Sequence, residues 1–261
     1  MEIILFTHLG LGDFILNVPI IYYLLEKKET VVHIICYEHN KNNIEKFIIN
    51  NEKIKLMPFK NLNEIRKIFP NNSVNNYKDK LILRSGLHAV KSNINSFPFF
   101  FYNDLNIDIN IMKSHFNVTN TKKAEELHNY ILHDDYIFIS NETSCGELFD
   151  INDILLKHDI DKNNKLVICS NKNIYPPNHK FYTLANKFIY KIDNIVLIDY
   201  KLVIENASFI ILCDSSLFSF SILLKLKSIK NALIVRTNEM NWNDFLSYMD
   251  NKFIIYDNIL T

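Results

Sequence analysis

A glycine-containing turn near the N-terminus constrains the fold of this chain more than any other segment. The sequence has only four glycines, and Gly10 and Gly12 both lie in the turn at residues 8–13. An apolar segment precedes this turn, and apolar residues at helical spacing follow it over residues 14–25. A strand, a two-glycine turn and a helix form the first βα unit of a Rossmann-like domain. We expect these glycines to supply positive φ angles and to let a ligand approach the backbone.

Asp13 lies at the end of this turn, where two roles compete. A carboxylate at a helix start commonly caps backbone N–H groups. The same carboxylate could act as a catalytic base directed into a cleft. His8 is the second catalytic candidate, because a neutral imidazole beside the glycines could orient a substrate.

Composition limits the class of protein. Hydrophobic residues make up 48% of the 261 positions, which allows a substantial core, and the formal net charge of zero gives no support for nucleic-acid binding. The cysteines and histidines lack metal-ligand spacing, and no Asp-x-Asp follows a predicted strand, so we expect free thiols and no metal. No apolar run approaches the ~18 residues of a membrane span, and no secretory leader is recognisable. We therefore expect a cytoplasmic protein.

Strands and helices alternate in two series along the chain. The aromatic segment 97–102 interrupts the first series. We interpret it as the packing of a crossover helix, with an acceptor-binding wall as the alternative. This rhythm predicts an α/β protein of two Rossmann-like lobes with parallel sheets, 1–130 and 131–261, and a ligand cleft between them. The further predicted strands are 31–36, 54–57 (ended by Pro58), 81–84, 136–140, 166–169, 195–198, 209–213, 232–235 and 253–256.

Polar residues that follow strands are the candidate site residues, because ligands of open α/β sheets bind at the carboxyl ends of strands. Asp214, Ser215 and Ser216 follow one apolar strand and precede a helix. They fit a helix cap and a phosphate cradle equally well. The other candidates in such loops are Arg84, Asn141, Ser170 and Lys172.

The turn at residues 8–13 resembles the opening of a glycosyltransferase-like family found in AT-rich marine bacteria and large DNA viruses. The expected location is therefore the bacterial cytoplasm or, for a viral chain, the host cytoplasm or the virion. The resemblance continues through segments 36–40 and 136–142, and it is clearest at 204–208 and 213–216. More distantly, the chain is similar to heptosyltransferases of the two-lobed GT-B architecture. Those enzymes share a Gly-Asp turn after the first strand and an Asp-Ser/Thr-Gly step near the end.

The heptosyltransferase resemblance implies specific roles. Asp13 would deprotonate an acceptor hydroxyl in an N-terminal acceptor lobe. Asp214, Ser215 and Ser216 would form part of a donor diphosphate pocket in a C-terminal donor lobe, with Glu205 near the donor. This chain departs from the pattern, since Ser216 replaces the usual glycine and Phe218-Ser219 stands where a histidine is common.

The expected activity is metal-independent transfer of a hexosyl, pentosyl or heptosyl group from a nucleotide-activated donor to a hydroxyl of a glycan or glycoprotein. The nucleotide sugar is a co-substrate, and no other cofactor is expected. Lys172 and Ser170 would join the donor site, and Gly10, Gly12, Arg84 and Asn141 would line the acceptor side or cleft. The departures favour an alternative, a non-catalytic glycan- or nucleotide-binding protein. A dinucleotide-dependent oxidoreductase is a weaker third hypothesis, because the third glycine of the G-x-G-x-x-G fingerprint is absent.

Overall fold

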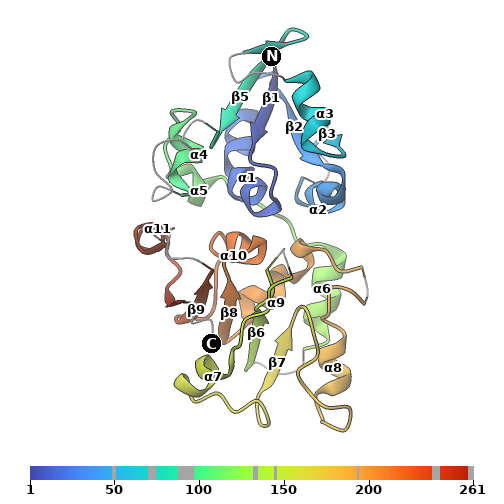
Figure 1. Cartoon of the computed structure of the whole chain (residues 1–261), viewed down its shortest axis with the longest axis vertical. Helices are drawn as coiled ribbons and strands as arrows, with labels where there is room; N and C mark the ends of the chain where they lie inside the picture. Colours follow the sequence, from blue (N-terminus) through green and yellow to red (C-terminus); the bar gives the residue numbers. More distant parts are fainter. Residues whose placement is uncertain are drawn as a thin grey trace. The chain divides into compact units, whose positions relative to one another are not determined.

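Two compact units make up the chain in the computed structural model, Met1–Thr119 and Asn120–Thr261 (Figure 1). The structure describes residues 1–48, 51–69, 75–87, 97–131, 135–143, 146–192, 194–236 and 242–257. The division lies earlier than the expected boundary after residue 130. The reason is that helix α6 (Lys122–Asn129) packs against elements of the second unit. The Thr121 hydroxyl that caps α6 also donates to the buried carboxylate of Asp199, 2.6 Å away.

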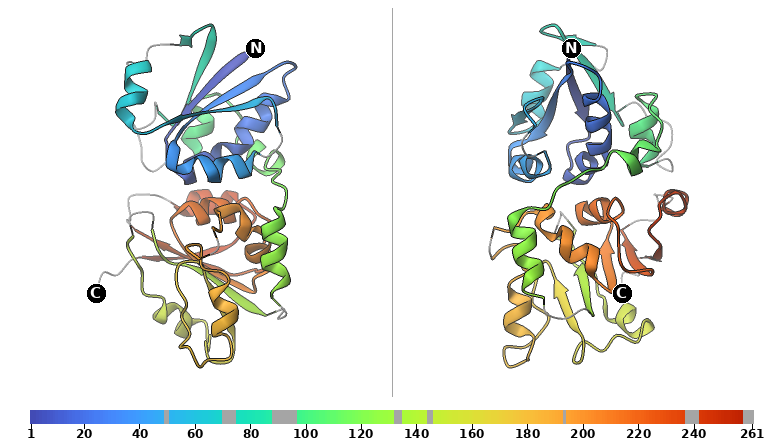
Figure 2. Two further views of the ribbon diagram at one scale, coloured as in Figure 1. Left: turned by 90° about the vertical axis from the view of Figure 1, so that its right-hand side faces the viewer. Right: turned by 180° about the vertical axis from the view of Figure 1, so that it is seen from behind.

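The first unit is built on a five-stranded sheet in the order β3-β2-β1-β5-β4. All of its strand pairs are parallel except β4 with β5. Helices cover both faces, and Figure 2 shows α1 and α3 on opposite sides of this sheet. Its elements are β1 (Glu2–Thr7), α1 (Leu11–Leu25), β2 (Val31–Tyr37), α2 (Lys41–Phe47), β3 (Ile54–Phe59), α3 (Leu62–Ile68), β4 (Asn76–Tyr77), β5 (Lys80–Ser85), α4 (Phe99–Asn103) and α5 (Ile111–Ser114), with a 3₁₀ turn at Glu38–Asn40.

Pro58 does not end the third strand, contrary to the prediction. Strand β3 continues to Phe59, and Pro58 pairs with Cys36 of β2. Because β3 is the last strand on its side of the sheet, a residue without an N–H can be accommodated there.

The second unit has a five-stranded sheet in the order β10-β9-β8-β6-β7, with every strand pair parallel. In four of these five strands, β6 to β9, every residue is buried, as expected for strands covered on both faces. The elements are α6, β6 (Tyr136–Ser140), α7 (Asn152–Lys157), β7 (Leu166–Cys169), α8 (Tyr182–Asn186), η4 (Leu197–Tyr200), α9 (Lys201–Asn206), β8 (Phe209–Cys213), α10 (Ser216–Ser221), β9 (Asn231–Val235), α11 (Trp242–Tyr248) and β10 (Phe253–Asp257).

The predicted strand at 195–198 is wrong. Three of its four apolar side chains, Ile195, Val196 and Ile198, are buried, but the backbone turns into the 3₁₀ helix η4. The Asp199 carboxylate accepts the Val196 N–H at 2.9 Å, which closes this turn locally. The apolar pattern of this segment therefore reflects burial and not a strand. The hydrogen bond from the Val196 N–H to the Asp199 carboxylate stabilises the turn instead.

Among the residues that the structure describes, no helix combines the length and the apolar character needed to cross a bilayer.

Candidate functional site

The positive φ angles expected for the glycines of the β1–α1 turn are absent. Gly10 is the N-cap of α1 with φ −67° and ψ 147°, and neither Gly10 nor Gly12 has a positive φ. A Cβ on Gly10 would lie 2.6 Å from Oδ2 of Asp13. A glycine at position 10 therefore makes room for the Asp13 carboxylate, rather than supplying an unusual backbone angle.

Asp13 is the third residue of α1, and its side chain is half-buried. Burial raises its pKa above the ordinary value of 3.8, although the nearby His8 and a hydrogen bond from the Gly10 N–H act in the opposite direction. The N-cap itself is Gly10, and Asp13 lies in the first turn of α1, where a negative charge is favourable beside the helix N-terminus. The raised pKa gives it a property typical of catalytic bases. The two roles are compatible in one carboxylate.

A buried polar network fixes the first turns of α1 against the ends of β1 and β5. Asn17 is fully buried, and its Nδ2 donates to the Asp13 carbonyl (2.8 Å) and to Oγ1 of Thr7 (3.1 Å). The Ser85 hydroxyl at the end of β5 contacts Oδ1 of Asn17 and the carbonyl of Phe101. Sequence reasoning missed Asn17. Its signal was a lone amide on an otherwise apolar helix face.

His8 is held beside this turn by the loop that follows β5. Its Nε2 donates to the carbonyl of Gly86 at 2.9 Å, because a carbonyl oxygen can only accept. The ring packs against Phe100 and Phe101, with ring centroids 5.9 and 6.0 Å away. Both phenylalanines are buried, as the packing interpretation of the aromatic segment predicts, whereas Phe97 and Phe99 are half-buried. The rings of Phe100 and Phe101 also position His8.

Arg84 lies on the opposite face of the sheet from α1, the helix that carries Asp13. It is buried and pairs with Phe6 in the sheet, on the face that packs against α3. The neighbouring residue Ser85 faces α1, because successive side chains of a strand point to opposite faces. Burial lowers the pKa of Arg84. The predicted acceptor role of Arg84 has no support from this placement.

In the second unit, Asp214 follows β8 and forms an ion pair that the sequence did not predict. Arg236, directly after β9, donates from Nε to Oδ1 of Asp214 (2.8 Å) and from Nη2 to its carbonyl (3.1 Å). Burial raises the pKa of Asp214, and Arg236 opposes that effect. Ser215 is the N-cap of α10, but its side chain makes no capping hydrogen bond. The signal for Arg236 was a charged residue directly after an apolar strand.

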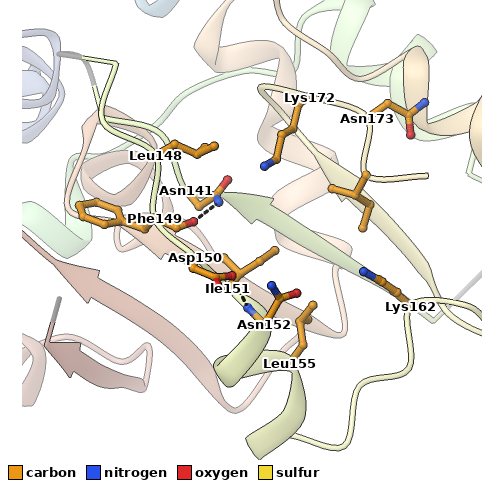
Figure 3. A pocket seen from close by; sticks show the side chains of 11 residues that line it. Asn141, Leu148, Phe149, Asp150, Ile151, Asn152, Leu155, Lys162, Lys172 and Asn173 are labelled. Atoms are coloured by element: carbon orange, nitrogen blue, oxygen red, sulfur yellow. Dashed lines mark hydrogen bonds between the residues drawn. The ribbon is translucent and has the colours of Figure 1, made fainter. Parts of the chain in front are cut away.

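Asn141 and Lys172 line one pocket of about 480 Å³, although they were assigned to different substrates. Asn141 follows β6 and is buried, and its Nδ2 donates to the carbonyl of Phe149 (Figure 3). Ser170 after β7 is buried, and its backbone bonds to Ile139 and Tyr190. The pocket is lined by Asn141, Leu148, Phe149, Asp150, Ile151, Asn152, Leu155, Lys162, Lys172, Asn173 and Ile174.

Glu205 lies away from this edge of the sheet. It is in the last turn of α9, which leads into the amino end of β8, whereas Asp214 follows the carboxyl end. Five residues of strand at ~3.3 Å each separate the two ends by roughly 16 Å. Glu205 accepts an ion-pair hydrogen bond from Lys201 at 3.0 Å. The structure therefore does not bring Glu205 together with Asp214.

A metal site was not expected. Within the described ranges, no three His, Cys, Asp or Glu side chains gather so as to hold a metal ion. Three of the four cysteines (Cys36, Cys169 and Cys213) fall within the same ranges, and these are free and buried.

No protein-family model and no curated protein sequence matches this chain. Solved structures do match it. The iron-containing dodecameric glycosyltransferase TibC of enterotoxigenic E. coli is 14% identical, with a TM-score of 0.51 over 90% of this chain. A family 9 glycosyl transferase of Veillonella parvula is 11% identical, with a TM-score of 0.54, over the whole of this chain and 87% of its own.

The ADP-heptose LPS heptosyltransferase II of E. coli is 11% identical, with a TM-score of 0.52 over 98% of this chain and 90% of its own. This chain spans 57% of the length of TibC. At such identities the likeness shows the fold, and nothing in it bears on a viral or marine origin. The predicted fold class is confirmed: the chain is an α/β protein with two parallel-strand, Rossmann-like sheets, the fold of GT-B glycosyltransferases.

Proposed function

We propose that this protein transfers a sugar from a nucleotide-activated donor to a hydroxyl acceptor. The observation that carries the proposal is Asp13, a half-buried carboxylate with a raised pKa at the carboxyl end of β1. Ligands of such sheets bind at this end of the strands. The fold shared with glycosyltransferases supports the reaction class.

Each group has a place in the proposed reaction. Asp13 accepts the proton of the acceptor hydroxyl while the acceptor oxygen bonds to the anomeric carbon of the donor. The bond from that carbon to the diphosphate oxygen breaks, and the nucleoside diphosphate leaves with the electron pair. The buried contacts of Asn17 hold the turn that carries Asp13. On the donor side, Asp214, Ser215, Ser216 and Lys172 line the carboxyl edge of the second sheet.

A thermal-shift screen of nucleoside diphosphates and nucleotide sugars tests the donor assignment. We expect at least one to raise the melting temperature at millimolar concentration. A ligand at 100 times its Kd adds about 2.7 kcal/mol of stability to the folded state. A panel without any shift would contradict the proposal. A donor that binds is then offered with hydroxyl acceptors, and the released nucleoside diphosphate is measured.

A non-catalytic binding protein is the second candidate, because Ser216 stands where the resembled enzymes have glycine. The two candidates differ in one readout. A transferase releases nucleoside diphosphate only with an acceptor present, and it loses this activity when Asp13 is replaced. A binding protein shows the same thermal shift with no release from any donor and acceptor pair.

Gly10→Ala tests whether position 10 makes room for the Asp13 carboxylate. Alanine adopts φ −67° without strain, so we expect little change in melting temperature. The new Cβ would displace Oδ2 of Asp13 from its position 2.6 Å away. A misplacement of about 1 Å can cost roughly 10²-fold in rate. We expect a kcat/KM loss of that order in a steady-state assay.

The control for Gly10→Ala is the same change in an Asp13→Asn background. If Gly10 makes room for the Asp13 carboxylate, the effects of Gly10→Ala and Asp13→Asn on rate are non-additive. Gly10→Ala then causes almost no further loss of rate in the Asp13→Asn background. Additive losses would show that the new methyl group acts on something other than Asp13.

A further inference from the structure

The ion pair between Arg236 and Asp214 has a buried partner and an exposed partner. The Asp214 side chain is 5% exposed, whereas that of Arg236 is 38% exposed. The backbone N–H of Asp214 also bonds to the carbonyl of Ile234 at 3.0 Å, which ties the turn after β8 to the end of β9. Arg236 is therefore held at the carboxyl edge of the sheet by its bonds to Asp214, while part of its side chain stays exposed.

This geometry leaves Asp214 unsuited to contact an anion. Its carboxylate is buried, carries the wrong charge, and accepts a bond from Nε of Arg236. The guanidinium has five N–H donors and gives two of them to Asp214, through Nε and Nη2. Arginine presents its donors in a rigid planar fork that matches phosphate oxygens. An arginine already oriented by a carboxylate also loses less side-chain freedom when it binds a ligand.

Given the proposed function, we propose that Arg236 contacts the diphosphate of the donor and that Asp214 is a positioning residue for its guanidinium. As the bond from the anomeric carbon to the diphosphate oxygen breaks, negative charge develops on that oxygen. N–H groups fixed beforehand at this place stabilise the charge without reorganising. Ser215 and Ser216, in the same turn, are only partly buried and lie beside the same edge.

The test is isothermal titration of the full chain with inorganic pyrophosphate, with ADP, UDP, GDP and CDP, and with the matching nucleosides. Hydrogen bonds to charged groups contribute about 1.5–3 kcal/mol, so Arg236→Gln should weaken pyrophosphate and nucleoside diphosphate binding roughly 10- to 100-fold. Nucleoside affinity should be unchanged, since nucleosides carry no phosphate. Arg236→Lys keeps the charge but not the fork, and should recover part of the loss. Arg66→Gln, an equivalent change at an exposed position of α3, should have no effect.

Asp214→Ala separates positioning from simple charge. If Asp214 only repelled the anion through its negative charge, removing that charge would strengthen pyrophosphate binding. If Asp214 orients the Arg236 guanidinium, its removal should weaken pyrophosphate binding. Because Arg236→Gln leaves a buried carboxylate without its partner, the double variant Arg236→Gln/Asp214→Asn is measured beside it. Melting curves establish that each variant is folded.

The outcomes distinguish this proposal from the proposed function. If a nucleoside diphosphate binds wild type and Arg236→Gln equally well, the role of Arg236 is refuted while the donor assignment stands. If pyrophosphate binding depends on Arg236 but no nucleotide binds, the anion contact stands and the donor assignment fails. If wild type binds neither pyrophosphate nor any nucleoside diphosphate, both fail. Stronger pyrophosphate binding by Asp214→Ala would refute the positioning role.

Discussion

Asp13→Asn is expected to lower the rate of sugar transfer by about 10²–10⁴-fold, the range typical of proton-transfer catalysis. The amide has nearly the shape of the carboxylate but cannot accept the acceptor proton. Donor affinity should stay close to wild type, because we assign the donor to the second unit. The measurement is single-turnover release of nucleoside diphosphate at saturating donor. Equal turnover by both proteins would move the base elsewhere, and His8 would be tested next by His8→Gln.

The stability of Asp13→Asn provides the control for that experiment. Because burial raises the pKa of Asp13, the folded chain keeps this proton to a higher pH than the unfolded chain does. The free energy of unfolding is therefore highest below pH 3.8, where Asp13 is protonated in both states. It falls as the pH rises from 3.8 through the raised pKa of the folded chain. Asparagine does not titrate. We therefore expect wild type and Asp13→Asn to have equal melting temperatures at acid pH. At neutral pH the melting temperature of Asp13→Asn should equal or exceed that of wild type. A large loss at neutral pH would make the carboxylate structural.

Gly86→Ala is expected to destabilise the first unit by about 2–5 kcal/mol. Gly86 has φ +79°, which costs an L-residue about 1–2 kcal/mol. A Cβ there would also lie 2.5 Å from two ring atoms of Phe101 and 2.8 Å from Phe100. Overpacking of this kind adds about 1–3 kcal/mol. Amide hydrogen exchange of the β1 and β5 segments, followed by mass spectrometry, measures the loss in the unit concerned.

Gly146→Ala is a matched control for the steric part of this effect. Gly146 has φ +83°, but among the described residues, its chain neighbours apart, a Cβ there would meet no atom within 4 Å. We expect only the backbone cost of about 1–2 kcal/mol, confined to the second unit. Because His8 donates to the Gly86 carbonyl, Gly86→Ala should also impair catalysis in the fraction that folds. Equal destabilisation by Gly86→Ala and Gly146→Ala would mean that the rings of Phe100 and Phe101 move away from the new Cβ without lowering the free energy of unfolding.

The sequence determined the alternation of strands and helices, because apolar runs and glycine or polar turns are local signals. The first βα unit, the aromatic packing at residues 100–102 and the parallel sheets all follow from such patterns. Local patterns failed where another group competed for the backbone, as Asp199 does at the predicted strand 195–198. They also failed where the place of a strand in its sheet mattered, as for Pro58 on edge strand β3.

The candidate site divides in the same way. Asp13, His8 and Asp214 could be found from the sequence, because polar residues after strands are visible in it. Only the tertiary structure decided which groups meet: Arg236 with Asp214 across two strands, Asn17 with Ser85, and His8 with Gly86. The same is true of the raised pKa of Asp13, since burial and neighbouring charges depend on residues distant in sequence. Chemistry resides in side chains, but their protonation and partners are properties of the folded chain.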